Sequence, residues 1–266
     1  MKKNSNIAST VILSFDGYSD IWPIFFECFK RNWRLDFPTY LVTNQLKPDF
    51  DNVKNICVGR EKSWSDRTRK AIKEVKSEYI ILMLEDYFVT SVLENERIEN
   101  LLSFMRNHNA DYLRIYPFPK MRFKSENNNG IHQIPDNSLY GVNLQPSIWK
   151  RDYLLKVLGK ENYSAWEFEA RQKNGENTQI KGKNFTIDYK IFNMLNGVLQ
   201  GKWYPNSVKK LKKIGINVNT YDRKILSKRK TLVYRLKIFI RKIISPKIIR
   251  KLKPFLKKFG FKFVTD

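Results

Sequence analysis

The sequence predicts an α/β fold in which a mostly parallel sheet is flanked by helices, and two observations lead to this expectation. Short apolar runs bounded by polar or turn residues recur in the first half of the chain, and such runs are typical of strands buried on both faces. Segments with apolar residues at helical spacing separate these runs. Because strands that alternate with helices favour parallel sheets with right-handed crossovers, we expect a sheet of this kind.

Most of the expected elements lie in the first half of the chain. The strands cover residues 10–15, 38–44, 53–58, 79–84 and 111–116. The helices cover residues 21–33, 64–77 and 94–108. In the second half we expect a strand over 139–148, a helix over 150–158 and a helix that begins at Tyr163, with loops over 118–138 and 172–184. The apolar but mixed pattern over 187–203 is assigned to no single element.

Length and charge divide the chain into a body and a tail. A chain of 266 residues with 42% apolar residues can bury one sizeable core, or one core with an appendage. Residues 207–266 hold 20 Lys and Arg against 2 acidic residues, a net of +18, whereas residues 1–206 hold 30 against 24, a net of +6. We therefore expect one domain over 1–206 and a basic tail over 207–266.

The tail combines its charge with apolar residues at helical spacing over 225–263, a pattern that Pro246 interrupts. This pattern is typical of basic amphipathic helices that lie on an anionic membrane, where each basic residue contributes about 1 kcal/mol. One alternative is a helical subdomain packed on the body with a solvated basic face. The other is nucleic-acid binding, which is disfavoured because the apolar stripe is continuous and wide, so no nucleic acid is expected as a partner.

The expected location of the protein follows from its cysteine content, its N-terminal residues and the length of its apolar runs. It has only two cysteines, too few for a disulfide framework, which favours a reducing cytosol. The N-terminus makes a poor signal peptide, and no apolar run approaches the roughly 20 residues that span a bilayer. We expect a cytoplasmic protein held peripherally on the inner face of the cell membrane.

Acidic residues follow two of the expected strands, where open parallel sheets bind their ligands. Glu85 and Asp86 come directly after 79–84, and in a chain so basic they suggest a divalent metal bridging to an anionic ligand such as a nucleotide diphosphate. The alternative is that one carboxylate caps the next helix and the other is solvated. Asp16 ends the first strand beside Gly17 and is a candidate for a base or ribose hydroxyl, although a plain turn explains it as well.

The segment 64–69 is a second candidate site, because it places two arginines at an expected helix start. Backbone amides at a helix N-terminus favour anions, and guanidinium groups suit phosphate oxygens. Arg67 and Arg69 are therefore candidates for binding a diphosphate, together with their neighbours Trp64 and Asp66. The alternative is an ordinary surface helix with two arginines.

The segment 166–169 places Glu167 and Glu169 among bulky rings near a helix start. A carboxylate lodged against aromatic rings can have a raised pKa, which suits a general base that takes a proton from a hydroxyl. Residues two apart on a helix cannot both face one site, so one of the pair is structural, and the sequence leaves open which.

Eight short segments carry a wider pattern, in order along the body: 14–18, 40–44, 64–67, 84–88, 110–117, 145–149, 166–169 and 201–203. In these segments the chain resembles a family of bacterial glycosyltransferase-like proteins of capsule and lipopolysaccharide assembly, with a GT-A-type nucleotide-sugar fold. The tail lies outside this resemblance.

The resemblance implies transfer of a sugar from a nucleotide-sugar donor to a lipid-linked or oligosaccharide acceptor. It places Glu85 and Asp86 where the family has an Asp-x-Asp motif that holds Mn²⁺ or Mg²⁺, with Asp86 as the metal ligand and Tyr87 where the second Asp would stand. Because some enzymes of this fold use basic side chains instead of a metal, Arg67 or Arg69 is an alternative to the metal ion. A non-catalytic nucleotide- or glycan-binding subunit with the same fold is the main rival function.

Overall fold

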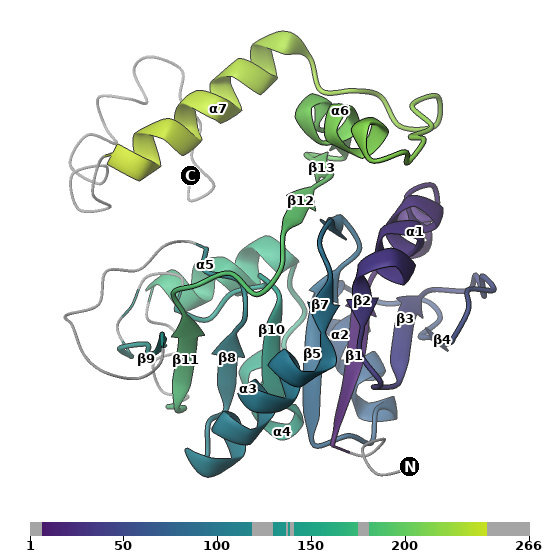
Figure 1. Ribbon diagram of the computed structural model, residues 1–266. Coiled ribbons are helices and arrows are strands. Elements are labelled where there is room, and N and C mark those ends of the chain that lie inside the picture. Colours follow the sequence, from purple (N-terminus) through teal and green to yellow (C-terminus); the bar gives the residue numbers. More distant parts are fainter. Residues whose placement is uncertain (1–6, 119–129, 137, 139–140, 175–180, 244–266) are drawn as a thin grey trace. The chain divides into compact units, whose positions relative to one another are not determined.

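The computed structural model describes residues 7–118, 130–136, 138, 141–174 and 181–243, with no side-chain burial given for 173–174 and 237–243. The chain divides into two compact units, Met1–Leu195 and Asn196–Asp266 (Figure 1). The expected boundary at residue 206 falls inside a helix of the second unit, and the assignment of roles to the two ranges stays a prediction.

An eight-stranded sheet forms the centre of the first unit, in the order β4-β3-β1-β5-β10-β8-β11-β9. The strands β4, β3, β1, β5, β8 and β11 run in one direction, while β10 and β9 run against their neighbours. The expected α/β fold with a mostly parallel sheet is thus confirmed. Their bounds are β1 Ala8–Leu13, β3 Thr39–Thr43, β4 Val53–Cys57, β5 Tyr79–Leu84, β8 Tyr112–Arg114, β9 Ile131–Gln133, β10 Ser147–Lys150 and β11 Asn184–Ile187.

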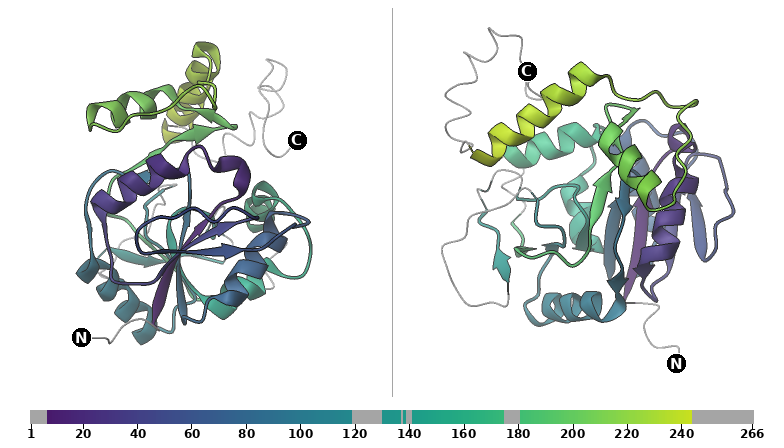
Figure 2. Two further views of the ribbon diagram at one scale, coloured as in Figure 1. Left: turned by 90° about the vertical axis from the view of Figure 1, so that its right-hand side faces the viewer. Right: turned by 45° about the horizontal axis from the view of Figure 1, so that its top comes forward.

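Helices cover both faces of this sheet (Figure 2). On one face lie α1 (Trp22–Asn32) and α3 (Asn95–Asn107), and on the other lie α2 (Trp64–Glu74), α4 (Arg151–Leu158) and α5 (Ala165–Asn174). Short elements complete the unit: η1 Asp16–Tyr18, β2 Trp33–Arg34, β6 Tyr87–Val89, β7 Leu93–Glu94 and the start of β12 Met194–Asn196. Because helices cover both faces of the sheet, a ligand site can form at the ends of the strands.

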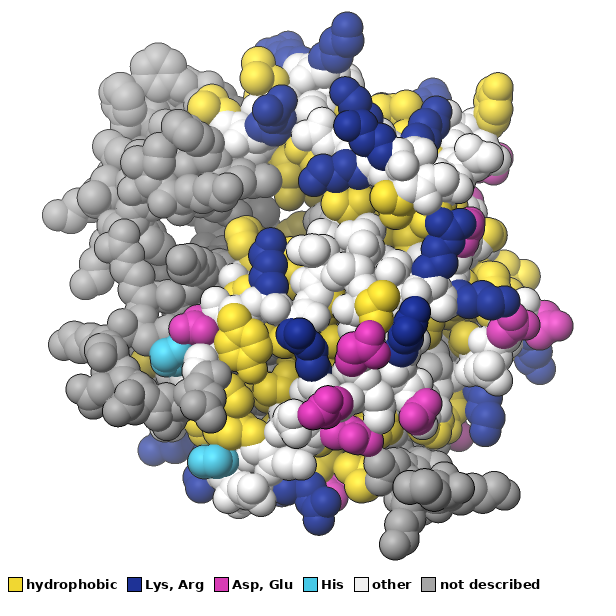
Figure 3. All heavy atoms as spheres, in the orientation of Figure 1, with side chains coloured by type: hydrophobic (Ala, Val, Ile, Leu, Met, Phe, Trp, Pro, Cys, Tyr) yellow, Lys and Arg dark blue, Asp and Glu magenta, His cyan; other side chains and the backbone are white. Residues whose placement is uncertain are grey.

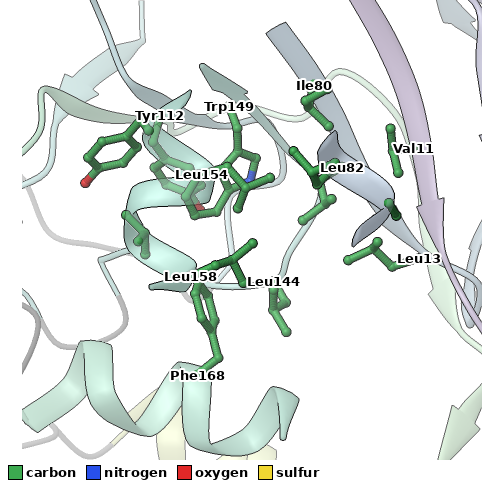
Figure 4. Packing of buried hydrophobic residues seen from close by; sticks show 14 of the residues in the cluster. Val11, Leu13, Ile80, Leu82, Tyr112, Leu144, Trp149, Leu154, Leu158 and Phe168 are labelled. Atoms are coloured by element: carbon green, nitrogen blue, oxygen red, sulfur yellow. The ribbon is translucent and has the colours of Figure 1, made fainter. Parts of the chain in front are cut away.

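The core on the α2, α4 and α5 face is a single cluster of buried side chains. Val11 and Leu13 of β1 point into it, because alternate residues of a strand face the same side. Figure 4 shows Phe168 of α5 reaching toward Leu158 and Leu144 in this cluster. Burial of a large side chain such as Phe contributes about 1.5–3 kcal/mol, so Phe168 helps to hold α5 on this cluster.

The second half of the body departs from the expected elements in two places. The strand expected over 139–148 begins only at Ser147 in the structure, since Pro146 cannot donate a ladder hydrogen bond and the Asn143 side chain turns the chain by accepting from Gln145 N at 3.0 Å. Residues 139–140 lie outside the described residues. The loop expected over 118–138 contains β9, which pairs with β11 at the sheet edge.

The second unit contains β13 (Val198–Leu199), β14 (Lys202–Trp203), α6 (Pro205–Lys213) and α7 (Lys228–Ile243). Trp203 is fully buried and donates its indole N–H to the Asn219 carbonyl at 3.1 Å, while Leu211 and Ile216 pack as further buried residues of this unit. The helix expected in the tail is confirmed as α7, and residues 244–266 lie outside the described residues. Among the helices that the structure describes, none is both long and apolar enough to cross a bilayer.

Candidate functional site

The strand order reverses between β1 and β5, because β3 lies on one side of β1 and β5 on the other. The two strands also end level, with Leu13 opposite Leu84. In open α/β sheets, ligands bind outside the carboxyl ends of the strands at such a reversal. The residues that follow β1 and β5 are therefore the candidate site, and the sequence expectation for Asp16, Glu85 and Asp86 directs attention to this edge.

Asp16 links the end of β1 to the chain that follows β3. Its carboxylate accepts hydrogen bonds from the backbone N–H groups of Asn44 at 2.9 Å, Gln45 at 3.0 Å and Leu46 at 3.2 Å. In return, Asp16 N donates to the Asn44 side-chain carbonyl at 3.1 Å. Because a carboxylate offers about four acceptor positions, these three bonds fix Asp16 and leave capacity for one further donor such as a hydroxyl.

Phe15 and Gly17 shape the surface beside Asp16. The Phe15 ring lies 4.9 Å from the Tyr18 ring. A Cβ placed on Gly17 would come within 2.5 Å of the Phe15 ring. Only glycine at this position allows the Phe15 ring to fold back over the turn. The Arg67 guanidinium carbon lies 5.0 Å from the centre of the same ring, within cation–π range.

Arg67 is the residue of segment 64–69 that reaches this edge. Its side chain is only 11% exposed, and its Nη1 pairs with the Glu61 carboxylate at 2.7 Å. The other oxygen of Glu61 accepts from the Asn44 side-chain amide. A chain of contacts thus runs from Asn44 after β3, through Glu61, to Arg67 on α2. It holds the positively charged guanidinium group of Arg67 beside the strand ends.

The other members of this segment contact the protein itself. Trp64 packs against the rings of Tyr163 and Phe168, at 6.5 and 5.4 Å. Asp66 donates its N–H to Ser63 Oγ at 3.1 Å, which caps the start of α2, and its carboxylate accepts from Lys62 N at 3.0 Å. The bond from Lys62 N is the main cause that holds the pKa of Asp66 below its ordinary value.

Arg69 donates from Nη1 to the Glu161 carbonyl at 2.6 Å and from Nη2 to Asn162 Oδ1 at 2.7 Å. These contacts fix the loop before α5 to α2. Ligand contacts for Trp64, Asp66 and Arg69 stay predictions, and the structure gives each of the three a structural contact.

Glu85 and Asp86 form the turn between β5 and β6, with Glu85 buried and Asp86 half-buried. The next residue, Tyr87, accepts a hydrogen bond from Gln145 Nε2 at 3.0 Å, which joins this turn to the chain entering β10. Among the described residues, no three His, Cys, Asp or Glu side chains group as a metal site. Proteins often hold Mg²⁺ through one or two carboxylates while phosphates and water supply the other ligands, and metal binding by Glu85 and Asp86 stays a prediction.

The environments of Glu167 and Glu169 differ strongly. Glu167 is exposed and forms a capping box with Ser164, accepting from Ser164 N at 2.6 Å and donating its own N–H to Ser164 Oγ at 3.2 Å. The bonds from Ser164 lower the pKa of Glu167. Glu169 is half-buried and accepts from Leu144 N at 3.2 Å, and desolvation of its carboxyl raises its pKa. The structure therefore gives Glu169 the environment of a general base, and the catalytic role of either residue stays a prediction.

Three polar residues at this edge were missed by the sequence reasoning. Asn44 directly follows an expected strand, and that position was the signal that could have identified it. Glu61 lies in an irregular loop with no periodicity. Arg114 ends β8, is 1% exposed and donates from Nε to Thr186 Oγ1 at 3.0 Å, and burial lowers its pKa.

Comparison with known proteins finds no matching family model and no matching curated protein. Solved structures do resemble the chain. S. aureus TarS 1-349 matches with a TM-score of 0.46 and 12% identity over 70% of this chain and 59% of that one. The same protein in complex with UDP gives a TM-score of 0.45 at 11% identity over the same shares. UDP-glucose pyrophosphorylase complexed with UDP-glucose gives 0.44 at 9% identity over 71% of this chain and 93% of that one.

The chain thus spans 59% of the length of TarS 1-349. These matched proteins were solved with nucleotides or nucleotide sugars, but similarity at this level does not define a function for this chain.

Proposed function

We propose that this protein is a glycosyltransferase that moves a sugar from a nucleotide-sugar donor to a surface glycan, of the capsule or lipopolysaccharide class. One observation carries the proposal: a fixed carboxylate (Asp16) and a guanidinium group (Arg67) lie beside the end of β1 at the strand-order reversal, and a half-buried carboxyl with a raised pKa (Glu169) bonds the chain that enters β10. A sugar transferase needs these groups for the nucleoside, the diphosphate and the acceptor proton respectively.

The donor side of the edge would be formed by the residues after β1 and β5. Asp16 would accept from a hydroxyl or base N–H of the nucleoside through its remaining acceptor position. Arg67, over the Phe15 ring that follows β1, would face the diphosphate. When Mn²⁺ or Mg²⁺ is bound, Asp86 with Glu85 would hold it, and the ion would supply positive charge to the departing diphosphate.

The acceptor side would use Glu169. The acceptor hydroxyl oxygen bonds to the anomeric carbon of the sugar, the bond from that carbon to the diphosphate oxygen breaks, and the hydroxyl proton moves to the Glu169 carboxylate. A pKa raised by burial brings that carboxylate closer to the operating pH, which is what an efficient general base requires. Glu169 reaches the edge through Leu144, one residue before the Gln145 that bonds Tyr87.

The acceptor that we propose is a lipid-linked glycan or an oligosaccharide, met by a cytoplasmic protein held on the inner face of the cell membrane. The basic composition of residues 207–266 supports this proposal, since it favours an anionic surface. Enzyme and lipid-linked acceptor on one surface would meet at a raised effective concentration.

The experiment is a thermal-shift screen of nucleotide sugars, followed by a transfer assay with those that stabilise the protein. A donor at about 100 times its dissociation constant should add about 2.7 kcal/mol to the free energy of unfolding. Asp16→Asn should reduce that stabilisation, while Asp49→Asn, an exposed carboxylate in the same region of the sequence, should leave it unchanged. Absence of stabilisation by any nucleotide or nucleotide sugar would contradict the proposal.

A second candidate is a non-catalytic subunit that binds a nucleotide or a glycan. It would use the same residues, because the bonds of Arg67 to Glu61 and of Asp16 to Asn44 hold both side chains in place for a bound ligand. Stabilisation by a nucleotide diphosphate without any transfer or hydrolysis of the matching nucleotide sugar would select this candidate.

A further inference from the structure

The helix α7 in the second unit has three exposed apolar side chains on one side. Leu232 is 67% exposed, Val233 40% and Leu236 45%. These are large values for apolar side chains on a helix whose own unit has a buried core of Trp203 and Leu211.

The same helix contacts its unit through a different side. The Tyr234 ring lies 5.5 Å from the Tyr204 ring, and Thr231 Oγ1 donates to the Leu226 carbonyl at 3.4 Å. At about 100° per residue, Tyr234 lies about 160° around the helix from Leu236. The apolar stripe therefore points away from the unit that holds the helix.

The charge around this stripe is strongly positive. Residues 196–236 contain eleven Lys and Arg, and Asp222 is their one acidic residue, a net of +10. Lys228, Arg229, Lys230 and Arg235 belong to α7 itself and are exposed. Dark-blue side chains are correspondingly dense over α6 and the start of α7 in Figure 3.

We propose that α7 docks flat on an anionic phospholipid bilayer, with Leu232, Val233 and Leu236 inserted at the interface and the flanking basic residues on the headgroups. An outward apolar stripe bordered by Lys and Arg is the pattern of interfacial helices. Charge favours an anionic bilayer over two other partners for the stripe. A second copy of the protein carries the same positive net charge, and the segment 244–266 is itself basic, so both would be repelled. This inference specifies the membrane partner and can be tested without any sugar substrate.

The test is co-flotation of the full-length protein with two sets of vesicles. One set contains phosphatidylcholine alone, and the other contains about 30% phosphatidylglycerol in phosphatidylcholine. Wild type should float with the anionic vesicles only and leave them as salt rises, because screening shortens the reach of surface charge to about 8 Å at physiological ionic strength. Leu232→Asp combined with Leu236→Asp should weaken the partition at least about tenfold, since insertion of both side chains is lost.

Two matched controls separate the contributions. Lys209→Gln with Lys210→Gln removes two positive charges from α6 and leaves the stripe intact, so its loss of partition should be smaller than that of the double Asp variant. Val92→Asp places an acid at an exposed apolar residue of the first unit and should float like wild type. Unchanged thermal unfolding of each variant shows that folding is retained.

Several outcomes would overturn the proposal. Flotation of the double Asp variant equal to wild type would exclude the stripe, as would loss of flotation on changing Ile248 and Leu252 to Asp but not on changing α7. A wild type that is dimeric without vesicles and becomes monomeric on Leu236→Asp would identify a second copy as the occupant. Binding to a DNA duplex with no flotation would identify nucleic acid. If transfer fails while flotation follows α7, only the proposed reaction is rejected.

Discussion

The ion pair between Arg67 and Glu61 should couple the two residues energetically, and this can be measured by a double-mutant cycle. The perturbations are Arg67→Gln, Glu61→Gln and the double variant. Each single change leaves one charge without its partner near the strand ends, where the side chains are 11% and 17% exposed. The double variant removes both charges and keeps side chains of related shape.

The expected magnitude follows from the geometry. The Nη1 to Oε1 distance is 2.7 Å, and a charge-assisted hydrogen bond of this length contributes about 1.5–3 kcal/mol. Residual solvent exposure reduces the attraction, so we expect a coupling free energy of about 1–2 kcal/mol. Removal of Arg67 also costs its contact with Phe15, but the cycle cancels that loss.

The assay is urea unfolding of the four proteins at low salt, followed by fluorescence. Lys30 and Asp51 provide the matched control, because they form an ion pair at 2.5 Å with both side chains more than 70% exposed, at 74% and 73%. This control cycle should show no resolvable coupling. A coupling for Arg67 and Glu61 no larger than that of the control would refute the reasoning that burial strengthens this pair.

The same variants connect stability to the proposed donor site. Since Glu61 partly neutralises Arg67, Glu61→Gln should leave more of the guanidinium charge available to a diphosphate. Nucleotide diphosphates should then stabilise Glu61→Gln more than wild type in the thermal-shift screen, and Arg67→Gln less. The opposite order would show that Glu61 supports the site by positioning Arg67 and that its charge does not weaken binding.

Three further predictions concern the carboxylates. Glu169→Gln should lower the turnover number by about 10² to 10⁴, while Glu167→Gln should keep most activity because its carboxylate only caps α5; equal turnover in both variants contradicts the assignment. The raised pKa of Glu169 means that the folded protein holds this proton more tightly than the unfolded chain, so its contribution to stability is present below the unfolded pKa of about 4.3 and declines as pH rises through the folded pKa. Glu169→Gln should remove that decline in unfolding experiments between pH 4 and 8, whereas a pH dependence identical to wild type would show that Glu169 is not the responsible group. Asp86→Asn should abolish transfer with the circular dichroism spectrum unchanged, and wild-type turnover in this variant would reject Asp86; chelation of wild type tests the metal separately.

The sequence was sufficient for much of the fold because strand and helix periodicities alternate clearly up to β8. It did not predict that β10 lies antiparallel between β5 and β8, since the apolar pattern of Ser147–Lys150 is compatible with either strand direction. Only the pairing of distant segments decides the direction of such a short strand. The length of this strand was also overestimated, because the turn made by Asn143 has no periodic signal.

The candidate site was partly predictable for a similar reason. The sequence placed Asp16, Glu85 and Asp86 after two strands, and the structure has them beyond the ends of β1 and β5; their binding roles stay predictions. The choice between Glu167 and Glu169 was left open, although the spacing from Ser164 to Glu167 is that of a capping box and could have assigned Glu167. Glu61 could not be found, because its contact with Arg67 depends on the path of the irregular loop that holds Glu61.

The bonds of Asp16 to residues 44–46 also bear on how the edge is assembled. They span 28 to 30 residues and form when β1, α1 and β3 come together, whereas the bond between Leu144 and Glu169 spans 25 residues in a later part of the chain. The two sides of the edge therefore belong to different segments of the first unit, joined through β5 between β1 and β10. Local opening of one segment need not open the other. Amide protons near Leu144 could thus exchange with solvent while those of residues 44–46 remain protected, leaving a protein that retains its donor side and has lost only the group that accepts the proton.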